Sequence, residues 1–213
     1  MIIDELITDR MESDVVRLKE LIKKTWQGMT AEEKEEYRDG VFPLEDINGI
    51  WLQDSVDEQL YSQPSAQRGG YCYSDLNRVE TAVAYIASAL VDAPDDLEDY
   101  ATSLNVAWDD YFALPYDETQ YSLTTKTDWV KTDKPLTSQM QRYYNNLVLI
   151  SQAFPSVGVP QINALDYQGA NQIEQMLVEV WNELQEAIKE RQARIRAAAE
   201  CYRSGEFYSG EVY

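Results

Sequence analysis

The stretch SDLNRVETAVAYIASAL, residues 74–90, has the clearest helical pattern in the chain. Its apolar residues are three or four positions apart, as on one face of an α-helix: Leu76, Val79, Val83, Ile86 and Leu90. Ser74 is a favourable N-cap for such a helix. The stretch therefore predicts an amphipathic core helix, whose apolar face needs other helices to cover it.

Two further helices are predicted between this stretch and residue 160. Pro94 and the acids that follow it suit the first turn of a helix that ends near Leu114. Another helix is expected to begin near Thr137 and to stop at Pro155. Between Pro115 and Pro135 the residues favour extended structure, but one such segment cannot form a sheet alone, so we expect a loop or a short hairpin.

The N-terminal residues predict a helical hairpin. A first helix should run from a cap at Thr8 to Gln27, with an apolar stripe at Met11, Val15, Leu18, Ile22 and Trp26. Thr30 and Glu33 have the spacing of a capping box, which predicts a short second helix to about Arg38. From Gly40 to Gly70 the helical spacing fails and glycine and proline recur, which indicates a long irregular segment.

The last helix is predicted from Asp166 to about Cys201, longer than a compact domain of this size requires. Four of its residues recur at intervals of seven: Trp181, Ile188, Ile195 and Tyr202. This seam is equally consistent with packing against the chain's own helices and with a coiled-coil contact to another copy. After it, Ser-Gly-Glu occurs twice beside Tyr202, Phe207, Tyr208 and Tyr213, which either dock onto a neighbour or fold back on the same chain.

The predicted fold is mostly α. It is a helical hairpin plus a helical bundle with a long C-terminal helix, a long irregular insertion and a short extended tail. The expected parts are residues 1–40 for the hairpin, 41–72 for the insertion, 73–165 for the helical core with an acidic segment at 92–120, and 166–213 for the long helix and aromatic tail.

Charge and composition exclude several partners. The chain has 38 acidic and 18 basic residues, a net charge of -20, and residues 41–120 hold 16 of the acidic and only 2 of the basic ones. Such a field repels phosphate backbones and anionic lipids, so we expect no nucleic-acid or membrane partner. No apolar run is long enough for a membrane span and no signal peptide is recognised, so synthesis and residence in the cytosol are expected, with Cys72 and Cys201 as unpaired thiols.

The residues offer little support for catalysis or for a cofactor. The chain has no histidine and no glycine-rich phosphate loop. The segment Asp46–Asp54 is only weakly similar to a calcium loop, because its glycine and closing acid are misplaced. Carboxylate pairs such as Asp109–Asp110 and Asp95–Asp96 could serve a glycosidase, but 38 acids make some pairs inevitable. We expect no enzyme and no cofactor; Trp51 and Trp129, in predicted loops, are the candidate glycan contacts.

Several segments together resemble a family of small virion-associated proteins, encoded among the tail genes of phages and prophages of Gram-positive bacteria. The segments span nearly the whole chain: Ile7-Thr8-Asp9-Arg10 with Asp14-Val15, Met29 to Glu33, Tyr73 to Glu80 with Ala84-Tyr85, Lys126-Thr127-Asp128-Trp129, Asn171-Gln172-Ile173-Glu174 and the Ser-Gly-Glu tail. Tyr73 to Glu80 is the most specific of them. Residues 41–69 look like an insertion relative to the family, and 92–120 looks enlarged.

The resemblance implies a structural component of a phage tail, baseplate or fibre attachment, with no catalytic residues to carry over. Such a protein would be assembled in the host cytoplasm and reside in the virion, as a homo-oligomer in contact with other virion proteins. Two alternatives remain open: a host-surface glycan-binding or receptor-binding accessory protein, and an acidic decoy of a DNA-binding protein.

Overall fold

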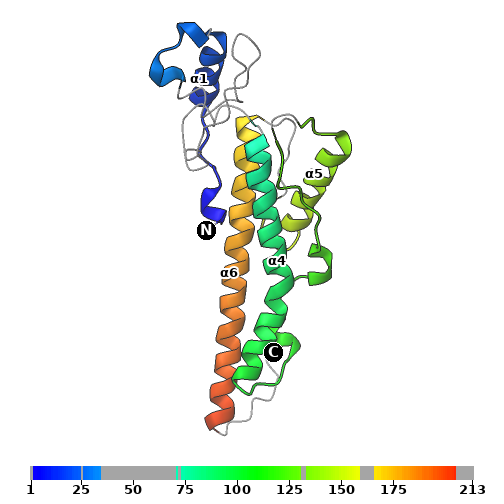
Figure 1. Cartoon of the computed structure of the whole chain (residues 1–213). Coiled ribbons are helices and arrows are strands. Elements are labelled where there is room, and N and C mark those ends of the chain that lie inside the picture. Colours follow the sequence, from blue (N-terminus) through cyan, green and yellow to red (C-terminus); the bar gives the residue numbers. More distant parts are fainter. Residues whose placement is uncertain are drawn as a thin grey trace.

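The computed structural model of the chain describes residues 2–24, 26–34, 71, 73–130, 133–158 and 166–204. Within them the fold is mostly helical, as the sequence predicts (Figure 1). These residues contain no strand, so of the loop and the hairpin expected between Pro115 and Pro135 the described part is a loop with one turn of 3₁₀ helix. The α-helices whose bounds the structure describes are α1 (Glu12–Lys23), α4 (Tyr73–Ser103), α5 (Thr137–Ser151) and α6 (Tyr167–Ser204). Short 3₁₀ helices accompany them: η1 (Ile2–Glu5), η2 (Trp26–Gly28), η4 (Asp110–Phe112) and η5 (Glu118–Tyr121). Residues 31–34 are also helical.

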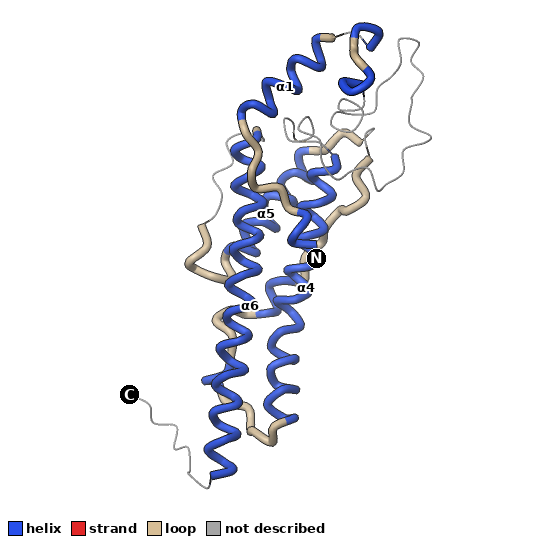
Figure 2. Tube along the Cα trace, turned by 90° about the vertical axis from the view of Figure 1, so that its left-hand side faces the viewer, coloured by secondary structure: helices blue, strands red, loops and turns tan. Residues whose placement is uncertain are grey.

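The molecule is built on two long helices that run side by side in the same direction. At 1.5 Å per residue, α4 and α6 extend for about 46 Å and 57 Å. Both begin at the same end of the molecule, where α5 covers one side of the pair (Figure 1). The N-terminal segment with η1 lies along the pair, whereas α1 stands beyond its end, as the second view also shows (Figure 2).

The core has two parts along this pair. The larger part surrounds the first halves of α4 and α6 and includes Ile86, Leu147, Ile150, Ile173 and Leu177, which are all 0% exposed. The smaller part lies where the loop after α4 returns along α6; it contains Leu97, Ala101, Val106, Phe112, Ile195, Ala198 and Ala199. Burial along the whole length of α4 thus holds the two helices together to their far ends.

The predicted helix break at Pro94 is wrong. Helix α4 continues through Pro94 to Ser103, and no separate helix reaches Leu114. A proline within a helix removes one backbone hydrogen bond, but here Ala93, Leu97 and Ala101 on the same helix face are buried. Their packing offsets the missing bond, so tertiary contacts outweigh the local signal.

Helix α4 ends at Ser103 and is terminated by Asn105, whose φ of 57° lies in the left-handed region. The N–H of Val106 donates to the carbonyl of Ala101, and the N–H of Asn105 donates to that of Thr102. This pair of bonds is a Schellman motif, in which asparagine is the usual alternative to glycine. Val106 then packs in the smaller core part, which fixes the direction of the returning loop.

The other observed elements differ from the predicted ones mainly at their ends. Helix α1 begins at Glu12 and not after Thr8, because residues 7–10 are extended against α6. The capping box of Thr30 and Glu33 is confirmed, with both reciprocal bonds at 3.1 Å. Helices α5 and α6 match their predictions closely. The predicted insertion at 41–69 and the tail beyond residue 204 lie outside the described residues.

Candidate functional site

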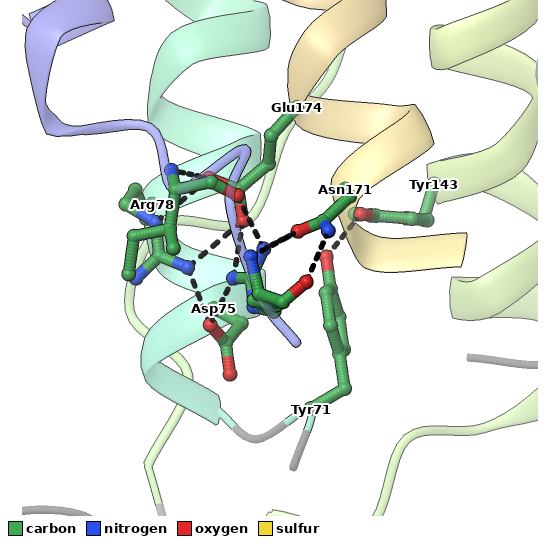
Figure 3. Close-up of polar contacts among 8 residues, drawn as sticks. Tyr71, Asp75, Arg78, Tyr143, Asn171 and Glu174 are labelled. Atoms are coloured by element: carbon green, nitrogen blue, oxygen red, sulfur yellow. Dashed lines mark hydrogen bonds and ion pairs between the residues drawn. The ribbon is translucent and has the colours of Figure 1, made fainter. Parts of the chain in front are cut away.

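The candidate site is a buried polar cluster where the N-terminal segment crosses the first turns of α4 and α6 (Figure 3). Arg10 comes from the extended segment, Asp75 and Arg78 from α4, and Asn171 and Glu174 from α6. Asp75 and Glu174 are 3% and 0% exposed, and Arg10 is 4% exposed. Charged groups this deeply buried persist only when they are paired, so their partners determine what the cluster can do.

Glu174 is the acceptor at the centre of the cluster. Its Oε1 accepts from Nη2 of Arg10 at 2.6 Å and from Nη2 of Arg78 at 2.9 Å. Its Oε2 accepts from Nε of Arg78 at 3.2 Å and from the backbone N–H of Ile7. Both carboxylate oxygens are therefore engaged by charged or backbone donors, and this carboxylate is not placed to take a proton from a substrate.

Asp75 completes a quartet of two acids and two arginines. Its Oδ1 accepts from Nη2 of Arg10 at 3.0 Å and also from Nη2 of Arg78. Burial alone would lower the pKa of the Arg78 guanidinium, but its hydrogen bond to Glu174 and the charges of Glu174 and Asp75 raise that pKa above its ordinary value. The quartet is electrically balanced, so it leaves no net charge that would attract an ionic ligand.

Two tyrosines border the quartet. The hydroxyls of Tyr71 and Tyr143 are 2.5 Å apart and share a hydrogen bond. Burial raises the pKa of both hydroxyls above the ordinary tyrosine value, and the nearby acid charges act in the same direction. Both therefore stay protonated at neutral pH and serve as neutral hydrogen-bonding groups.

A second buried polar cluster lies on α4 around Glu80, which is 1% exposed. Its Oε1 accepts from Nε1 of Trp129 and from Nη2 of Arg142, both at 3.2 Å, and its Oε2 accepts from the backbone N–H of Lys126 at 2.6 Å. The side-chain amide of Asn77 binds the backbone of Trp129 through both its N–H and its carbonyl. This cluster anchors the loop between α4 and α5 to α4.

The structure changes the interpretation of most predicted contact residues. Trp129 is only 2% exposed, so it is not available as a glycan-stacking surface; its indole N–H is held by Glu80. The loop prediction was right, but a loop can be buried when its polar groups are satisfied. Trp51, Phe207, Tyr208 and Tyr213 lie outside the described residues.

The seven-residue seam of α6 faces α4 within the same chain. Ile195 is fully buried in the smaller core part, Ile188 packs against both parts, and Trp181 contacts Tyr85 with ring centroids 5.0 Å apart. The intramolecular alternative therefore accounts for these three residues. Tyr202 departs from the seam and is 57% exposed, so it is the described member that a partner could reach.

The weaker chemical candidates are also accounted for. Asp109 caps η4 by accepting from the N–H of Tyr111, while Asp95 and Asp96 are exposed on α4. The described residues contain no group of three or more candidate metal ligands, and residues 46–54 lie outside them. None of the helices that the structure describes is both long and apolar enough to cross a membrane.

Sequence reasoning missed the buried charged residues Arg10, Asp75, Glu80 and Glu174. One signal was present: Glu80 and Glu174 each follow a core residue and each stand three positions after an asparagine. Comparisons with protein-family models, with curated proteins and with solved structures give no match.

Proposed function

We propose that this protein is a structural component of a phage virion, at the tail, baseplate or fibre attachment, and that it acts by assembling with other proteins. The observation that supports the proposal is where the resembling segments meet. Ile7 to Arg10, Tyr73 to Glu80, Lys126 to Trp129 and Asn171 to Glu174 are far apart in sequence, yet they contact one another in the two buried polar clusters.

These contacts give the resembling residues an architectural role. They fix two loop segments against two long helices, and both oxygens of the Glu80 and Glu174 carboxylates accept from arginines, the Trp129 indole or backbone N–H groups. Residues engaged in this way hold a scaffold together, whereas an enzyme would need an available acid, base or nucleophile at the same place. The proposal therefore includes no catalytic activity and no cofactor.

The exposed groups suit contacts with neighbours in a particle. At the far end of the helix pair, Tyr202 and Tyr111 are 57% and 46% exposed and Trp108 is 36% exposed. Exposed aromatic residues are enriched where proteins meet. We propose that several symmetric copies contact other virion proteins there, after assembly in the host cytoplasm.

Purified particles test this proposal. Particles of the phage or prophage that encodes the chain should contain it after banding in a density gradient, as shown by mass spectrometry and by labelling with an antibody. A Glu179→Ala variant, altered only on the exposed face of α6, should be incorporated like the wild type. If the protein is found free in the lysate and never in intact particles, the proposal is wrong.

A further inference from the structure

Two pairs of segments repeat along the chain. Residues 7–14 (ITDRMESD) and 126–133 (KTDWVKTD) share Thr-Asp, then an apolar residue, then Ser or Thr before a closing Asp. Residues 73–80 (YSDLNRVE) and 167–174 (YQGANQIE) share Tyr, an apolar residue, Asn, an apolar residue and Glu in the same spacing. The order is the same each time: the Thr-Asp segment, a shorter helix, and a long helix that starts with the Tyr–Asn–Glu pattern.

The first Thr-Asp segment is held by the second long helix. Asn171 of α6 accepts from the N–H of Arg10 at 3.1 Å and donates to its carbonyl at 2.9 Å. Glu174 accepts from the N–H of Ile7 and from the side chain of Arg10. Just after Arg10, the N–H of Met11 donates to the carboxylate of Asp14 at 2.8 Å.

The second Thr-Asp segment is held by the first long helix through the corresponding bonds. Asn77 of α4 accepts from the N–H of Trp129 at 2.7 Å and donates to its carbonyl at 2.9 Å. Glu80 accepts from the N–H of Lys126 and from the side chain of Trp129. The N–H of Val130 then donates to the carboxylate of Asp133 at 3.1 Å. Each of these bonds thus has its counterpart in the first site.

The arrangement is that of two equivalent units that hold each other. Each unit's Thr-Asp segment binds the other unit's long helix, and the long helices are parallel, as a two-fold axis along them would require (Figure 1). A symmetric dimer with exchanged segments has this geometry. The site on the long helix is therefore a recognition site for an extended segment supplied by a different unit.

Only one of the two segments is free to come from another molecule. Lys126 to Trp129 lies between buried Tyr121 and helix α5, which both pack in the larger core part. Residues 2–10 are followed by α1, which stands beyond the helix pair, and the α1 residues whose burial the structure describes belong to neither core part. The 36 residues between Lys34 and Tyr71 can span up to about 120 Å when fully extended, enough to reach a neighbouring copy.

We propose that residues 2–14 are an exchangeable arm, and that a second copy of this chain is the partner whose α6 receives it. The site binds the same segment in both cases, so each hydrogen bond that the arm makes to its own α6 can form equally with α6 of the second copy. Arm exchange would be the step by which copies of this chain associate with one another in the assembly proposed above. Its biological role rests on that proposed function, whereas the binding of the arm to α6 does not.

Two complementary full-length variants test the arm. Ile3→Asp places a charge at a buried position of the arm, where Ile3 is 6% exposed, and leaves the site on α6 intact. Asn171→Ala removes both bonds to the backbone of Arg10 and leaves the arm intact. Neither variant can dock its own arm fully, but the arm of the Asn171→Ala chain can bind α6 of the Ile3→Asp chain.

Each variant is made with two different affinity tags and mixed at high concentration, with circular dichroism to confirm that each remains helical. The two different variants should co-purify when mixed, and each should fail to co-purify with a differently tagged copy of itself. Asn77→Ala is the matched control, because it removes the same bonds from the segment that cannot leave; mixed with Ile3→Asp chains it should still supply an arm. Absence of the mixed complex while both variants are helical would overturn the proposal.

If a variant loses its helical signal, the wild-type chain provides the second measurement. Two tagged wild-type populations should form a mixed dimer on incubation at high concentration, detected by native mass spectrometry, and the milder variant Asn171→Asp in both should reduce it. If the wild-type chain is monomeric at every concentration, the arm-exchange proposal is wrong. If the protein is incorporated into particles but no arm exchange is found, only the arm proposal is wrong. If arms are exchanged but the protein is not incorporated into particles, only the virion proposal is wrong.

Discussion

At the scale of single residues, each buried carboxylate is stabilised by positively charged or hydrogen-bond donor groups next to it. Glu174 and Glu80 are almost wholly buried, and each is surrounded by donors from two or more segments. Helical spacing predicts which residues face a core, and Val79, the neighbour of Glu80, was predicted in this way. It does not predict that a carboxylate will lie in the core, because that depends on arginines distant in sequence.

Replacement of Glu174, the central hydrogen-bond acceptor of the quartet, should lower the free energy of unfolding strongly. In Glu174→Ala the two arginines keep only Asp75 as a buried counter-charge, and breaking a buried ion pair from one side costs about 3–5 kcal/mol. Urea unfolding followed by circular dichroism measures the change. Glu179→Ala, further along on the exposed face of α6, should stay within about 0.5 kcal/mol of the wild type. Equal losses in the two variants would show that the quartet does not stabilise the fold.

The tyrosine pair should make the fold sensitive to alkali. The pKa of Tyr143 and of Tyr71 is raised in the folded state, first by burial, so above about pH 10 the unfolded chain releases protons that the folded chain retains. Their contribution is fully present below pH 10 and is lost as the pH rises, by about 1.4 kcal/mol per pH unit for each tyrosine.

This slope is measured from urea unfolding at a series of alkaline pH values. The double variant Tyr71→Phe with Tyr143→Phe should flatten it, whatever its effect at neutral pH. The exposed Tyr202, changed to Phe, is the control and should leave the slope unchanged. An unaltered slope in the double variant would assign the alkaline loss to other groups.

At the scale of elements, the helices that carry a regular apolar stripe could be predicted and their junctions could not. The stripe of residues 76–90 predicted the first half of α4, and the long apolar pattern after Asp166 predicted α6 closely. The prediction of a helix start at Pro94 was wrong, because burial of the helical turns after Pro94 outweighs the local preference of proline for a first turn. That burial depends on the packing of α4 in the folded chain and cannot be read from the local sequence. The seven-residue seam of α6 was correct in position, but sequence alone does not say whose helix covers it.

The end of α4 depends on one left-handed residue. Asn105 tolerates its positive φ, whereas a β-branched residue there should cost about 1–2 kcal/mol. Asn105→Val should therefore lower the melting temperature, measured by circular dichroism, and Asn105→Gly should preserve it. Because Val106 must turn back onto the smaller core part, the valine variant should also weaken the far half of the helix pair. Identical melting temperatures for valine and glycine would contradict this explanation.

At the scale of the whole molecule, charge is distributed unevenly along the helix pair. Residues 92–118 contain nine acids and no base, and most of them are exposed on α4 and on the loop after it. The arginines of α6 nearby bind backbone and tyrosine groups of this region: Arg191 the carbonyl of Ala113, Arg194 that of Tyr111, and Arg196 the hydroxyl of Tyr100. These arginines of α6 thus hold the far end together through carbonyl and hydroxyl groups, and they do not neutralise its acidic surface.

Neutralising that surface should stabilise the fold at low salt. The exposed group Asp95, Asp96, Glu98 and Asp99, changed to the corresponding amides, should add roughly 1 kcal/mol, because like charges repel and lie toward the negative end of α4. The gain should disappear at about 1 M salt, where charges are screened. Lys189→Gln, which makes the chain more acidic, is the opposite control and should lower the melting temperature slightly at low salt. A gain that persists at high salt would point to helix propensity.

The position of the arm site at the beginning of α6 also determines how the molecule would respond to force. The arm site lies at the beginning of α6 and the chain leaves α6 at Ser204, so tension between these two points runs along the helix axis. The contacts between the arm and α6 are then loaded in shear, all at the same time, and do not open one after another as in peeling. An arm and a helix joined in this way resist extension until these contacts break together, which is the mechanical property of a tie.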